Sequence, residues 1–147
     1  FDTSAQVMPV EWNFYYVATR PGASTPSLYR VFYDGNTRQQ AQDLVSNVES
    51  LRLHYGENTA VDASGAPTLV ADVWRTSASS VTDWSRVVAV RVGLMMVSGD
   101  DNANPDITLA APTLLGQTYT LPGGASTKRL RKEYSTTVVL RNSVAAR

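Results

Sequence analysis

The chain lacks cysteine altogether and has a single histidine among its 147 residues. Without cysteine there is no disulfide, no thiolate metal site and no thiol nucleophile. Because His54 is the only imidazole, a metal site built on several histidines is excluded as well. These absences remove the residue types on which many metal centres and nucleophilic enzymes depend.

An excess charge and a long apolar run are also lacking. Thirteen basic residues balance thirteen acidic ones, so no net field draws the protein to nucleic acid or to an anionic membrane. No stretch reaches the roughly 18–20 consecutive apolar residues that a membrane-spanning helix requires. The chain opens on Phe1 rather than methionine, from which we expect a processed or trimmed fragment. Its length and 43 % hydrophobic content predict a single domain, residues 1–147.

The most apolar segment, residues 84–98, predicts a central β-strand. Its valine content favours a strand over a helix. Every second residue from Val88 to Met96 is apolar, and the opposite side is apolar except for Arg91. This pattern is typical of a strand covered on both faces. Arg91 then needs a partner or access to the surface, and we interpret it as a structural residue at a sheet-to-helix junction rather than a ligand-binding one.

Apolar–polar alternation predicts further strands at residues 10–18, 28–33, 51–55 and 130–142. The first two are expected to pair as an antiparallel hairpin, and the last to lie beside the central strand. Helical spacing predicts a short helix over residues 37–47 and a helix or turn over 69–74. Residues 57–67 and 99–106 are expected to be loops, and 107–124 a long excursion with a short strand near 117–121. The predicted class is α+β, mostly antiparallel β with short helices.

A weak calcium-loop candidate lies in the loop at residues 99–106. Its oxygen-bearing residues have i, i+2, i+4, i+6 spacing and are Asp100, Asn102, Asn104 and Asp106. Pro105 stands where a calcium loop has glycine, and Ala111 stands where it has a bidentate glutamate. A solvated loop is therefore the favoured interpretation, with weak calcium binding as the alternative.

Other candidate residues have plain structural interpretations. His54 occupies an outward-facing position of its predicted strand, which indicates an exposed surface histidine. The basic run at residues 128–132 (KRLRK) is expected to protect a strand edge rather than bind nucleic acid. Trp12, Trp74 and Trp84, with the seven tyrosines, could form a binding platform, but core packing is favoured for most of them. No catalytic residue, metal site or cofactor is predicted, and the residues indicate a non-enzymatic binding or assembly domain.

Four segments in order resemble the PilW family of type IV pilus minor pilins. They are PSLYR (26–30), DLVSNVESLRLHYG (43–56), DWSRVVAVRV (83–92) and RLRKEYSTTVVLRN (129–142). The resemblance implies a pilin-like globular domain that normally follows a long apolar N-terminal helix, which is absent from this sequence. That helix would be the only membrane contact, and it would pack in the filament core after assembly.

By this resemblance the protein is a non-enzymatic minor pilin without a cofactor. It would help initiate type IV pili in a tip complex with other minor pilins, the major pilin and a tip adhesin, and no nucleic-acid partner is expected. It would lie on the periplasmic side of the bacterial inner membrane before assembly and at the extracellular pilus tip afterwards. If the helix packs on the strand at residues 84–98, one face of that strand should be left partly uncovered here.

Two alternatives remain open at the level of sequence. One is a J-type pseudopilin of a type II secretion system, which belongs to the same superfamily. The other is a free ligand-binding β domain for glycan, calcium or DNA, in which the tryptophans and the basic run would make the contacts.

Overall fold

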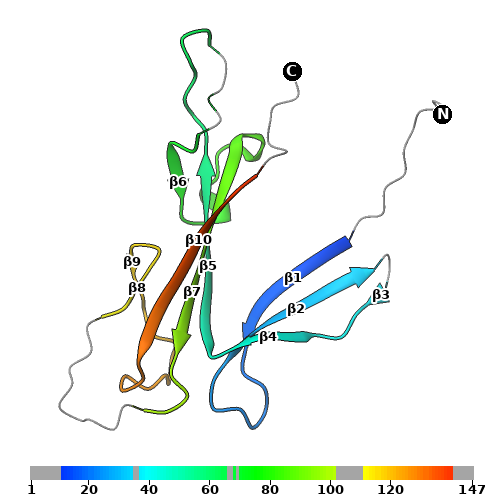
Figure 1. Cartoon of the computed structure of the whole chain (residues 1–147), viewed down its shortest axis with the longest axis vertical. Coiled ribbons are helices and arrows are strands. Elements are labelled where there is room, and N and C mark those ends of the chain that lie inside the picture. The colour runs from blue at the N-terminus through cyan, green and yellow to red at the C-terminus, as the bar shows by residue number, and fades with distance from the viewer. Residues whose placement is uncertain (1–10, 35–36, 66–67, 69, 102–110, 141–147) are drawn as a thin grey trace.

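In the part of the chain that the structure describes, two four-stranded antiparallel β-sheets and one small two-stranded sheet make up the fold (Figure 1). The computed structural model describes residues 11–34, 37–65, 68, 70–101 and 111–140. Across these residues the helical content is limited to two 3₁₀ turns, Ala78–Ser80 and Trp84–Arg86. The antiparallel β part of the predicted class is confirmed, whereas the predicted short α-helices are wrong. None of the helices within the described ranges is long and apolar enough to cross a membrane.

The first sheet is built around β2 (Ser27–Asp34). On one side β2 pairs along its whole length with β1 (Glu11–Ala18), so the predicted hairpin is confirmed. On the other side it pairs with β3 (Thr37–Arg38) and β4 (Gln42–Ser46). The helix predicted over residues 37–47 is therefore wrong. The backbone groups of this segment pair with the free edge of β2, and this long-range pairing overrides a short helical pattern of apolar residues.

The second sheet has the strand order β10–β7–β5–β6. Its members are β5 (Val48–Glu57), β6 (Val73–Arg75), β7 (Val87–Val97) and β10 (Arg131–Val139). β7 is the predicted central strand and β10 is its predicted neighbour, and both predictions are confirmed. The helix or turn predicted over 69–74 is wrong where the structure describes it as strand, because β6 pairs with the end of β5. A small hairpin, β8 (Thr113–Leu114) with β9 (Gln117–Thr118), replaces the single short strand expected near 117–121.

Asn47 lies at the junction between the two sheets. It links β4 to β5 with a positive φ of 64°, a left-handed conformation that asparagine tolerates better than most residues. Its side-chain oxygen accepts a hydrogen bond from Thr25 Oγ1 at 2.7 Å, and its carbonyl accepts one from the Val97 amide at 2.9 Å. Contacts from the β1–β2 connection and from the end of β7 thus fix the turn at Asn47, and the two large sheets diverge from this end (Figure 1).

Candidate functional site: the open face of the second sheet

One face of the second sheet carries apolar side chains that the described residues cover only in part. We call it the open face, and it is formed by β5, β7 and β10. Its members are Leu51, Leu53, Tyr55, Val90, Val92, Leu94, Met96, Tyr134 and Val138. The strand register places them side by side, with Leu51 and Tyr134 flanking Leu94.

Exposure along the open face rises from the centre of the sheet to its edge. The β7 members from Val90 to Met96 are half-buried, whereas Tyr134 is 54 % and Val138 is 49 % exposed. Trp84, which is 56 % exposed, extends the apolar surface by packing its ring against Tyr55 with the centroids 5.1 Å apart. A continuous apolar surface of this kind is typical of an interaction site.

The open face ends in an apolar groove where it meets the first sheet. The groove has a volume of about 560 Å³, and it is lined by Val45, Leu94, Met96, Val97, Ser98, Leu130, Arg131, Lys132 and Tyr134. Val45 comes from β4, so both sheets contribute to its walls. The open face together with this groove suits an elongated apolar element laid along the sheet.

Over β7 and the neighbouring β5, the opposite face of the second sheet is covered by the chain itself. Met95 of β7 is fully buried with Leu114 and Tyr119 from the region of the β8–β9 hairpin. The Leu115 amide donates a hydrogen bond to Glu133 Oε1 at 2.8 Å, which ties the hairpin to β10. The expectation that one face of the central strand would be partly uncovered is therefore confirmed, and the reading of a strand covered on both faces is wrong.

Gly93 is required for this close packing of the hairpin on β7. A Cβ atom at residue 93 would lie 2.7 Å from Leu115 Cγ and 3.0 Å from Leu114 Cδ1. Both distances are too short for ordinary van der Waals contact, so only glycine lets the two leucines approach the strand.

Arg91 finds an aromatic partner on the covered side of the sheet. Its guanidinium carbon lies 4.1 Å from the centroid of the Trp74 ring, a cation–π contact between β7 and β6. The structural role predicted for Arg91 therefore has a partner, but the expected sheet-to-helix junction is wrong because both residues belong to strands.

His54 is buried, so the prediction of an exposed surface histidine is wrong. Only 4 % of its surface is accessible, and Nε2 has no hydrogen-bond partner in the described part of the chain. Burial, followed by the positive charges of Arg52 and Arg91, lowers the pKa of His54 below its ordinary value. These effects favour the neutral form of the imidazole. The alternation pattern placed His54 on the polar side of β5 but could not show that distant segments cover that side.

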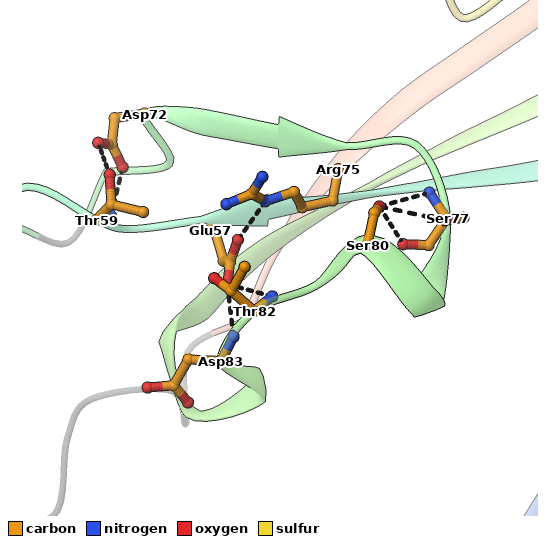
Figure 2. Close-up of polar contacts among 8 residues, drawn as sticks. All are labelled: Glu57, Thr59, Asp72, Arg75, Ser77, Ser80, Thr82 and Asp83. Carbon is orange, nitrogen blue, oxygen red and sulfur yellow. Dashed lines mark hydrogen bonds and ion pairs between the residues drawn. The ribbon is translucent and has the colours of Figure 1, made fainter.

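Glu57, itself buried, is the centre of a partly buried polar cluster at the end of β5 (Figure 2). Its side chain is 1 % exposed and forms an ion pair with Arg75 Nε. Glu57 Oε1 accepts hydrogen bonds from Thr82 Oγ1 at 2.6 Å, the Thr82 amide at 2.9 Å and the Asp83 amide at 2.7 Å. The hydrogen bonds from Thr82 and Arg75 lower the pKa of Glu57 to about 2.

The Glu57 cluster is built for structure rather than for proton transfer. A carboxylate that accepts four hydrogen bonds and stays ionised near neutral pH is a poor general acid or base. It anchors the connection between β6 and β7 to the sheet (Figure 2). The sequence prediction placed Glu57 in a polar loop, and nothing in its spacing to Arg75 or Thr82 signals that the three would meet.

The basic run at residues 128–132 does not form a free cationic patch. Arg131 makes a bidentate ion pair with Glu49 at 2.7 and 2.8 Å, and the two side chains are only 5 % and 6 % exposed. Arg129 donates to the Ser24 carbonyl at 3.0 Å and lies 3.5 Å from an Asp101 carboxylate oxygen. The prediction that this run protects a strand edge is thus wrong for Arg131, whose charge is used inside the fold.

The remaining sequence candidates have mixed outcomes. Trp12 is 61 % exposed and Trp84 56 %, so core packing is wrong for both, whereas Trp74 is half-buried. Of the calcium-loop candidates, Asn102, Asn104 and Asp106 lie outside the described residues, and only Asp100 is described. Within the described ranges, no group of three or more His, Asp or Glu side chains is placed to hold a metal ion.

Comparison with known proteins gives one match. No curated protein and no solved structure matches the chain. The sequence profile of PilW, described as Type IV Pilus-assembly protein W, matches residues 14–142, which include every strand from β2 to β10 and most of β1. The chain therefore belongs to the PilW family of type IV pilus-assembly proteins.

Proposed function

We propose that this domain is the globular part of a minor pilin that helps to initiate and assemble type IV pili without catalysing a reaction. Membership of a pilus-assembly family gives the process. The observation that carries the proposal is the open face, a sheet surface whose half-buried core residues, such as Leu94 and Met96, need an apolar partner. Recognition by burial of such a surface requires no chemistry on a substrate.

The partner proposed for the open face is the apolar N-terminal helix that pilin-like proteins carry. A helix laid along β7 would cover the half-buried positions of that strand and end in the groove beside Val45. The helix would hold the domain at the periplasmic side of the inner membrane before assembly. It would then place the domain in a complex with other minor pilins, the major pilin and a tip adhesin at the pilus tip.

A gene deletion in the bacterium that encodes this protein tests the proposal. Surface pili are counted by electron microscopy in the deletion strain, and the full-length gene is returned either unchanged or with Leu94→Asp on the open face. Thr118→Asp, an exposed position on β9, is the matched control. We expect the deletion to lose pili, the unchanged gene and Thr118→Asp to restore them, and Leu94→Asp to fail at equal protein level.

The same strains separate the proposal from its alternatives. A deletion strain with a normal number of pili contradicts a role in pilus initiation. If that strain also loses secretion of exoproteins, the protein acts as a J-type pseudopilin of a type II secretion system and not as a minor pilin. Restoration of pili by Leu94→Asp would show that the open face is not the surface that assembly uses.

A further inference from the structure

The outer edge of β10 is a free strand edge in the part of the chain that the structure describes. β10 pairs with β7 from Arg131 opposite Val97 to Val139 opposite Ala89, and no described strand pairs with its other side (Figure 1). Such an edge presents a row of backbone donors and acceptors that can pair with another chain. Natural edges are usually protected by charges, proline, bulges or short length.

None of these protections operates over residues 134–139. The charged residues of β10 are its first three, and Arg131 and Glu133 are used inside the fold, by Glu49 and by the Leu115 amide. The six residues that follow (YSTTVV) contain no charge, proline or glycine, and their pairing with β7 has no bulge. Four of them are β-branched, a composition that favours strand pairing.

The side chains on both faces of this segment are exposed, so they can pack against those of a strand added at the edge. Tyr134 and Val138 on the open face are 54 % and 49 % exposed, and Val139 on the opposite face is 65 % exposed. Ser135, Thr136 and Thr137 are exposed as well, so every side chain over residues 134–139 is accessible to an added strand.

We propose that β10 pairs with β10 of a second copy of this chain, antiparallel and about a two-fold axis at Thr136. In this register Tyr134 of each copy lies opposite Val138 of the other, an aromatic–β-branched pair that stabilises sheets. Lys132 lies opposite Leu140 and Glu133 opposite Val139, so no like charges lie opposite each other over residues 132–140. The pairing joins the two second sheets and makes their open faces continuous. It depends on the exposed edge alone and stands apart from the role in pilus assembly.

Self-association of the purified chain tests this proposal. Light scattering after size exclusion, over a range of concentrations, should show a species of twice the 16.0 kDa protomer mass. Thr136→Lys places two positive charges directly opposite each other on the axis and should weaken dimerisation by about fivefold or more. Thr136→Glu should act in the same way, and a mixture of the two variants should restore the dimer. Thr118→Lys, on the exposed strand β9, should leave it unchanged.

The absence of cysteine allows the register to be read directly. Thr136→Cys should form an intermolecular disulfide under mild oxidation, because side chains directly opposite each other lie within bridging reach. Thr118→Cys is the control that should stay reduced. If the protein is monomeric at every concentration tested, the proposal is overturned, and any strand that pairs with this edge must come from a different protein. A dimer that Thr136→Lys leaves unchanged also overturns it, because the contact then lies elsewhere.

Discussion

Breaking the buried ion pair between Glu49 and Arg131 should strongly destabilise the domain. The pair links β5 to the start of β10 across β7, and its side chains are 6 % and 5 % exposed. Glu49→Gln keeps the shape of the side chain but leaves the guanidinium without its carboxylate. In the unchanged protein the hydrogen bond to Glu49 raises the pKa of Arg131 above its ordinary value. The arginine keeps its charge in the variant as well, because an arginine side chain is protonated at neutral pH without such help.

The expected loss follows from the two hydrogen bonds of the pair. Hydrogen bonds to charged groups contribute about 1.5–3 kcal/mol each, and removing one partner of a buried pair costs about 3–5 kcal/mol. A domain of this size has a total stability of about 5–15 kcal/mol. Glu49→Gln should therefore remove a large part of the free energy of unfolding and lower Tm by about 6–20 °C.

Urea unfolding followed by circular dichroism measures this loss. The matched control is Glu11→Gln, because the ion pair of Glu11 with Arg30 is exposed, with side chains 53 % and 31 % accessible. That change should cost no more than about 1 kcal/mol. The double variant Glu49→Leu with Arg131→Met should recover most of the loss, since it leaves no buried charge unpaired. A Glu49→Gln protein as stable as the control variant would refute the reasoning.

Three further predictions concern single residues. Gly93→Ala should lower the free energy of unfolding by about 1–3 kcal/mol, because the new Cβ would lie 2.7 Å from Leu115 Cγ. Gly99→Ala is the control and should leave it unchanged, since no atom lies within 4 Å of a Cβ at residue 99. The urea concentration at the midpoint of unfolding measures both effects. The lowered pKa of His54 means that the unfolded chain binds a proton more readily, so stability should fall as pH drops below 6.5, and His54→Gln should flatten this slope. Ionised Glu57 stabilises the fold at pH values above its ordinary pKa of 4.5, and this contribution should be lost as pH falls toward 2. The Glu57→Gln variant should therefore be less stable than the unchanged protein at pH 7, and its free energy of unfolding should fall less on acidification.

The alternation of apolar and polar residues correctly predicted the long strands, each of which pairs with a neighbouring strand over many residues. Residues 10–18, 28–33 and 130–142 alternate over most of their length, and each pairs with a neighbour along most of it. Period two is a local property of the backbone, so it can be read without knowledge of the partner. The open face of β7 was likewise visible as a row of apolar residues, although the sequence did not show which side the chain itself covers.

The errors fall where a contact between distant segments decides the outcome. Residues 37–47 form strands because the edge of β2 is available to them, and His54 is buried because other segments cover its side of β5. Glu57 is bound by Arg75 and Thr82, which lie 18 and 25 residues further along the chain. None of these contacts leaves a signature in local spacing, and each becomes predictable only when the sheet topology is known.

The first residues of β10 stabilise the fold, and the residues that follow are the ones proposed to pair with a second copy. Arg131 and Glu133 make its contacts with β5 and the β8–β9 hairpin, and both lie within the first three residues of the strand. The exposed side chains from Tyr134 to Val139 add little to the core. Substitutions at the start of β10 should therefore change the free energy of unfolding. Those at exposed positions such as Thr136 should change self-association while leaving unfolding nearly unaffected, so the two roles can be separated within one strand.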